Sequence, residues 1–129
     1  MTVVDTHVVL WLGETPHLLS RRAREVLAEG RREAQLAIAA VTLREIAWVL
    51  ASGRVTIPTS PLEYLRFVEE RFRVIAVDSR IAWRSVQFGP DYPSDPADRE
   101  IGATAIVLGA RLVTKDRRIR ASGEVDCIW

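Results

Sequence analysis

Short apolar runs alternate with longer segments of helical spacing along this sequence, and that alternation restricts the fold more than any other feature. Strands are predicted at 2–4, 36–39, 74–77, 112–114 and 125–128. Helices are predicted at about 20–29 and at 42–51, 61–71, 79–86 and 96–109, with helix ends at Gly30, Gly53 and Gly109. Strands that alternate with helices are typical of a parallel sheet buried on both faces. We therefore expect the α/β class, as a three-layer α/β/α domain with a central, mainly parallel sheet of four to five strands.

The length of 129 residues fits one domain, 1–129, that can bury a sizeable core. A single cysteine, Cys127, excludes an internal disulfide and a cysteine cluster for zinc. The early carboxylate Asp5 leaves no room for a signal peptide, and no apolar run approaches the ~20 residues that cross a bilayer. We expect a cytoplasmic protein without membrane association.

The net charge of +1 does not by itself indicate nucleic-acid binding. The distribution of charge is more informative, because all 18 basic residues except Lys115 are arginines. Five of them gather around one predicted helix: Arg21, Arg22, Arg24, Arg31 and Arg32. This cluster is either a solvated helix face or a patch that faces RNA, and the sequence leaves both interpretations open.

Four acidic residues fall where the βα loops of a parallel sheet converge. Asp5 follows the first predicted strand, and Asp116 follows the fourth. Glu45 lies about one turn into the helix after the second strand, and Asp98 lies in the first turn of the helix before the fourth. Because the functional crevice of such sheets lies beyond the carboxyl ends of the strands, we expect all four side chains to point into one crevice.

Each of these acids also has a possible role in helix capping. Asp5 and Asp116 could cap the helices that follow them, and Thr42 to Glu45 has the spacing of a capping box. Asp95 could be an N-cap ahead of Pro96, with Asp98 beside the positive end of the helix dipole. Capping explains each acid singly, but it does not require four acids to meet at the same end of one sheet.

Four ionised carboxylates in one crevice need a cation, because each close pair repels by roughly 4 kcal/mol at an effective dielectric constant of about 20. Oxygen ligands favour hard ions such as Mg²⁺ or Mn²⁺. The two histidines, His7 and His17, are too few and poorly spaced for a zinc site. His7 is either a packing or surface residue, or a ligand or RNA contact.

Six segments, in order along the whole chain, resemble the VapC toxins, which are PIN-domain ribonucleases of bacterial and archaeal toxin–antitoxin pairs. They are 5–11 (DTHVVLW), 45–47 (EIA), 53–55 (GRV), 95–99 (DPADR), 112–116 (LVTKD) and 128–129 (IW). The chain departs from the family pattern at Ala97, where relatives often have phenylalanine, and at 92–94, which replaces a stretch that commonly contains histidine and arginine.

The resemblance implies that Asp5, Glu45, Asp98 and Asp116 are the catalytic residues that hold Mg²⁺ or Mn²⁺. It implies that Thr114 orients a ligand through its hydroxyl, with Thr6 and Asp95 as further neighbours of the metal site, and that Arg99 is a possible RNA contact.

The same resemblance implies an endoribonuclease that acts as the toxin of a type II toxin–antitoxin pair and inhibits translation and growth. Hydrolysis would leave a 5′-phosphate and a 3′-hydroxyl, with the metal and nearby arginines stabilising the charge of the transition state. The implied partners are RNA, a small VapB-like antitoxin whose tail fills the groove near the acids, and a second copy in a homodimer. Trp11, Leu12 and Trp48 are either groove residues for that tail or ordinary core residues.

Two other classes of function are open to such a chain. An aspartyl-phosphate enzyme would use a strand-end aspartate such as Asp5 as its nucleophile. The phosphatase type has a second acid two residues later, where this chain has His7. The receiver type has a lysine after the last strand, whereas Lys115 precedes Asp116 here. A catalytically weak PIN-fold module would bind RNA or a partner without cleavage. The presence of all four acids favours the nuclease.

Overall fold

The structure, a computed structural model, describes residues 1–129 and contains a five-stranded parallel sheet with strand order β3-β2-β1-β4-β5. The strands are β1 (Thr2–Val4), β2 (Leu36–Ala39), β3 (Arg73–Ile75), β4 (Arg111–Val113) and β5 (Cys127–Ile128). The helices are α1 (Thr6–Glu14), α2 (Arg21–Arg32), α3 (Ala40–Ala51), α4 (Pro61–Arg71), α5 (Ser79–Ser85), α6 (Pro96–Val107) and α7 (Arg117–Ser122), with a short 3₁₀ helix at Pro16–Leu18.

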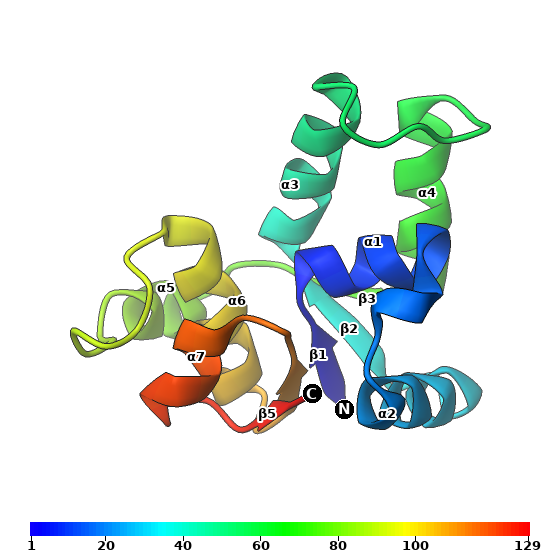
Figure 1. The fold of residues 1–129 in the computed structure, drawn as a ribbon. Helices are drawn as coiled ribbons and strands as arrows, with labels where there is room; N and C mark the ends of the chain where they lie inside the picture. The colour runs from blue at the N-terminus through cyan, green and yellow to red at the C-terminus, as the bar shows by residue number, and fades with distance from the viewer.

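Helices cover both faces of the sheet, so the predicted three-layer α/β/α architecture is confirmed (Figure 1). Successive strand residues alternate between two cores, as the two-residue period of a strand requires. Val4 packs with residues of α1 to α4, whereas its neighbour Val3 packs with residues of α5, α6 and α7. The central strands carry apolar residues on both faces because both faces are buried.

Two strands match their predicted ranges, and three differ at their ends. β3 and β4 each begin one residue earlier than predicted, at Arg73 and Arg111, because these arginines pair with Ala37 and Thr2 of the neighbouring strands. β5 contains only Cys127–Ile128 of the predicted 125–128. Helices α1 and α7 lie outside the predicted helical ranges, although they begin after Asp5 and Asp116, where helix caps were considered.

Gly30 was predicted to end a helix, and this prediction is wrong. α2 continues through Gly30 to Arg32. The glycine is required by packing, since a Cβ at this position would lie 2.5 Å from Leu36 Cδ2. Gly53 and Gly109 do follow helix ends, with φ angles of 73° and 60°.

The carboxyl ends of the strands carry the elements that form the candidate site. Figure 1 shows β1 leading directly into α1, and α3 and α4 side by side beyond that end of the sheet. The N-terminus lies beside α2 at the opposite end. None of the helices combines the length and the apolar character needed to span a membrane.

Candidate metal centre

Asp5 is buried, with 3% of its surface exposed, and both carboxylate oxygens have partners. Oδ1 accepts a hydrogen bond of 2.7 Å from the backbone N–H of Thr6, so Asp5 caps α1. Oδ2 accepts one of 2.6 Å from the Thr114 hydroxyl and lies 3.6 Å from Nδ1 of His7. These contacts hold the carboxylate in one orientation at the carboxyl end of β1.

The buried Thr114 hydroxyl connects two of the predicted site residues. It donates to Asp5 and accepts a 3.0 Å hydrogen bond from the backbone N–H of Asp116. One oxygen of Asp116, Oδ1, accepts from the backbone N–H groups of Arg118 and Ile119 in the first turn of α7, at 2.8 and 3.0 Å. The predicted capping roles of Asp5 and Asp116 are confirmed, and the same geometry places both acids at the ends of adjacent strands.

Glu45 belongs to the same site through Thr6. The Thr6 hydroxyl donates to Glu45 Oε1 at 2.6 Å and lies 3.1 Å from the hydroxyl of Thr42. The capping box predicted for Thr42 and Glu45 is wrong, because α3 begins at Ala40 and both residues lie inside it. The N-terminus of α3 is instead stabilised by Glu100 of α6, whose Oε2 accepts from Val41 N at 2.9 Å.

Asp98 projects from the first turn of α6, behind Asp95 and Pro96. The N-cap prediction for Asp95 is confirmed by a 3.4 Å hydrogen bond from Ala97 N to its side chain. Burial raises the pKa of Asp98 to about 7, and the negative charges of neighbouring acids add to the effect: Asp5, Asp95, Asp116 and Glu45. The pKa of Glu45 is raised as well, chiefly by burial, although the Thr6 hydrogen bond opposes the shift. The four predicted acids therefore interact electrostatically in one region.

A groove of about 800 Å³ opens between α1, α3 and the start of α6, and Asp5, Glu45, Asp95 and Asp98 line it. Three further charged residues that were not predicted as site residues also line the groove: Arg44, Arg54 and Glu100. Arg44 could have been considered because it is next to Glu45 in a predicted helix. Whether its side chain faces the groove, however, depends on how α3 packs. Arg54 belongs to the 53–55 segment of the family resemblance, which gave it no role, and Glu100 has no local sequence signal that places it at the groove.

The three hydrophobic groove candidates have different positions. Trp48 is 74% exposed and lines this groove, so its interpretation as a core residue is wrong. Trp11 is half-buried and packs against His7 and Trp129. Leu12 lines a separate, mainly apolar cavity of about 260 Å³ between α1, α2 and α4.

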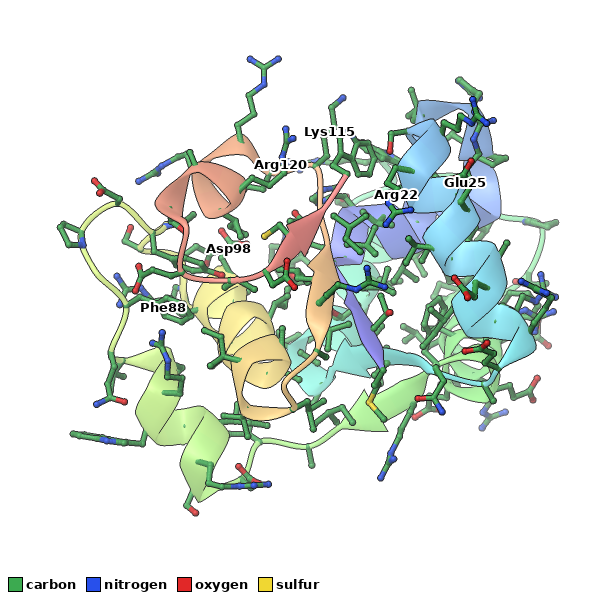
Figure 2. All side chains as sticks on the ribbon, turned by 90° about the horizontal axis from the view of Figure 1, so that it is seen from below. Arg22, Glu25, Phe88, Asp98, Lys115 and Arg120 are labelled. Carbon is green, nitrogen blue, oxygen red and sulfur yellow. The ribbon has the colours of Figure 1, made fainter.

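The predicted arginine contacts lie away from this groove. Arg99 is not among the lining residues, and its Nε donates to the carbonyl of Pro93 at 3.0 Å. The arginine cluster is on α2, which lies beside the N-terminus, at the opposite end of the sheet from the Asp5 end of β1 (Figure 1). Figure 2 shows Arg22 on α2, well separated from Asp98 on α6. The geometry favours a solvated helix face for this cluster.

The chemistry of the side chains fits a hard divalent cation, although they do not form a closed cage. No three His, Cys, Asp or Glu side chains of the structure are close enough together to hold a metal ion as they stand. The donors are nevertheless all oxygens, and no lysine or arginine nitrogen lies within 4.0 Å of the four predicted acids. Carboxylates that raise one another's pKa without a lysine or arginine partner suit Mg²⁺ or Mn²⁺.

Comparisons with known proteins agree with this architecture. The PIN domain family matches residues 2–124. Ribonuclease VapC22 of Mycobacterium tuberculosis is 36% identical over 119 residues, which cover 92% of this chain and 89% of that protein. The DNA-bound VapBC structure from Salmonella typhimurium has a TM-score of 0.75 at 18% identity, over 98% of this chain and 96% of that one. A toxin–antitoxin complex from Klebsiella pneumoniae has a TM-score of 0.70 at 23% identity, over 100% and 97% of the two chains.

Proposed function

This chain belongs to the PIN domain family, as its sequence motifs indicated, and from that membership we propose that it is an endoribonuclease that uses Mg²⁺ or Mn²⁺ and acts as the toxin of a VapBC-type pair. The observation that carries the proposal is the environment of Asp98. Its carboxyl lies near four other acids, of which Asp5, Glu45 and Asp95 line the groove with it; it has no lysine or arginine partner, and its pKa is raised to about 7. The 36% identity to a ribonuclease over nearly the whole chain supports RNA as the substrate.

Asp5, Glu45, Asp98 and Asp116 are the residues that would hold the cation. A bound divalent cation would supply positive charge to the phosphate oxygens and lower the pKa of a nearby water molecule. The Thr114 hydroxyl keeps Asp5 in its orientation, and the Thr6 hydroxyl does the same for Glu45. Such supporting hydrogen bonds preorganise ligands that would otherwise be free to rotate.

The groove also carries groups that suit the rest of an RNA strand. Arg44 and Arg54 lie on the α3 side, where guanidinium groups would bind phosphates next to the scissile one. Trp48 exposes an indole ring on which a base could stack. Arginines and an aromatic ring beside the acids would hold the phosphate backbone and a base in the groove.

A small VapB-like antitoxin and homodimer formation belong to the same proposal. The support is that fold neighbours from Salmonella typhimurium, Rickettsia felis and nontypeable Haemophilus influenzae are VapBC proteins. An antitoxin tail would cover the groove at Trp48 and exclude RNA. Co-expression with the neighbouring small open reading frame should relieve toxicity, and unaltered toxicity would contradict this part of the proposal.

An aspartyl-phosphate mechanism has less support from the sequence. The phosphatase type has a second acid at position 7, where this chain has His7, and in the receiver type the lysine follows the last strand, whereas Lys115 precedes Asp116. A binding module without catalysis differs from the proposal only in activity, so the cleavage assay decides between them.

The direct test is an RNA cleavage assay with protein purified free of any partner. We expect cleavage in Mg²⁺ or Mn²⁺, loss of cleavage in EDTA, and recovery when either cation is restored in excess. Products should carry a 5′-phosphate, which labelling of their ends would identify. Cleavage that persists in EDTA would contradict the metal requirement, and protein that binds RNA without cutting it in either metal would support the binding module instead.

A further inference from the structure

Tyr92 makes a buried contact with the residue that carries one of the site's acids. Only 1% of its surface is exposed, and its hydroxyl donates a 2.6 Å hydrogen bond to the backbone carbonyl of Asp98. Tyr92 lies in the loop between α5 and α6, where the sequence departs from the family pattern. The ring alone would fill the core, so the hydroxyl is the part of the side chain that needs an explanation.

Gly102 gives the phenol access to that carbonyl. It lies four residues after Asp98 in α6, the position whose backbone N–H pairs with the same carbonyl in an α-helix. A Cβ on Gly102 would lie 2.2 Å from the Tyr92 hydroxyl oxygen and 2.9 Å from Cζ. A side chain at position 102 would therefore displace the phenol from the first turn of α6.

The loop around Tyr92 is fixed by its own contacts. Phe88 stacks on Tyr92 with ring centroids 3.8 Å apart. The guanidinium of Arg84 lies over the Phe88 ring, 4.4 Å from the centroid of that ring. Arg99 donates to the carbonyl of Pro93, next to the phenol. Phe88 lies beside the end of α6 that carries Asp98 (Figure 2). The hydroxyl is thus held rigidly against one point of the helix.

We propose that Tyr92 is a positioning residue, whose hydroxyl fixes the first turn of α6 so that the Asp98 carboxylate faces Asp5 across the groove. This inference rests on the proposed metal-dependent function. It assigns the role to the hydroxyl and to the absence of a side chain at Gly102, and it gives a reason for a buried polar group at this position. The hydroxyl does not touch the substrate or the metal.

The test is Mn²⁺ binding to the full chain without RNA, measured by calorimetry, for wild type and Tyr92→Phe. Loss of the hydroxyl should weaken Mn²⁺ binding by about tenfold, the lower end of the effect of hydrogen bonds that support metal ligands. In cleavage assays the Mn²⁺ concentration at half-maximal rate should rise by the same factor, while KM for RNA at saturating Mn²⁺ should stay unchanged. Gly102→Ala should give the same pattern with the hydroxyl still present.

The matched control is Tyr64→Phe, which removes the same atom from the chain's other tyrosine. Tyr64 is also buried, but it belongs to α4, where it faces Gly13 of α1 and lines the separate apolar cavity rather than the groove with the acids. The Tyr64→Phe variant should bind Mn²⁺ with the affinity of the wild type. Equal Mn²⁺ affinity of Tyr92→Phe and wild type would overturn the inference alone, as would an equal loss in both tyrosine variants. Wild-type protein that binds no Mn²⁺ and cuts no RNA would overturn the proposed function, and the inference with it.

Discussion

The two carboxylate oxygens of Asp5 have different partners: one caps a helix, and the other lies in the acid-lined region. Oδ1 caps α1, while Oδ2 accepts from Thr114 in the acid-lined region. Asp116 likewise caps α7 through one oxygen and adds its negative charge to the region around Asp98. Capping and ligand roles are therefore compatible in this fold, because a helix that starts at the carboxyl end of a strand begins where the site lies.

Asp5→Asn separates the two roles of this residue. Asparagine is nearly as good a cap, so α1 should remain stable. The neutral amide removes one of the charges that repel Asp98, but it offers one oxygen for the two hydrogen bonds that Asp5 accepts, so these effects oppose each other and the melting temperature in EDTA should change little. Cleavage should nevertheless be lost, and Mg²⁺ should stabilise the variant much less than wild type. Melting curves with and without Mg²⁺ measure the stability of both proteins, and an RNA cleavage assay measures their activity. A variant that melts like wild type in both buffers and still cleaves RNA would show that Asp5 is not a metal ligand.

The raised pKa of Asp98 predicts how the metal-free protein responds to pH. Because the folded protein holds this proton up to about pH 7 and the unfolded chain releases it near 3.8, the folded state binds more protons between these values. The free energy of unfolding should therefore fall as pH rises through this window and level off above pH 7. Urea unfolding in EDTA at several pH values tests this sign, with Asp98→Asn as the control that should lack this contribution. A contribution from Asp98 that increases with pH would be inconsistent with the burial of a repelled carboxyl.

At the scale of elements, α3 obtains its N-terminal hydrogen bond from another helix. Its N-cap, Ala39, has no side chain that can accept, and Glu100 of α6 accepts from Val41 N. Glu100→Ala should lower the free energy of unfolding by about 1 kcal/mol, comparable to the loss of an N-cap. Glu100→Gln keeps an oxygen acceptor and should lose much less. Chemical denaturation of the three proteins measures the difference, and equal losses in both variants would exclude the capping role.

The sequence predicted which elements exist better than it predicted their contacts. The alternation of apolar runs located all five strands, and β1 and β2 matched their ranges because both are apolar throughout. The ends of β3 and β4 depend on pairing with neighbouring strands, which the local pattern does not contain. The capping box at Thr42 failed for the same reason, since the acceptor for α3 comes from Glu100, far along the chain.

At the scale of the whole molecule, topology explains why the meeting of the acids was predictable. β1 and β4 are parallel neighbours with Val4 opposite Val113, so the residues that follow them, Asp5 and Thr114, must come close. The groove depends instead on how α3 and α6 pack beyond the sheet, which no motif specifies. That packing places Trp48 in the groove and leaves Arg99 outside it.

Three helices surround the acids, and their arrangement places Trp48 in the groove, where we expect it to contact RNA. If an RNA base stacks on this exposed indole, Trp48→Ala should raise KM for RNA at least about fivefold, since a stacked base contributes ~1–3 kcal/mol. Mn²⁺ binding and the melting temperature should stay at wild-type values, because Trp48 is 74% exposed and is not a ligand. Trp83→Ala is the matched control, because Trp83 is 67% exposed on α5 and does not line the groove. Steady-state cleavage of a single-stranded RNA measures both variants; an unchanged KM for Trp48→Ala, or the same rise for Trp83→Ala, would remove the indole from the RNA path.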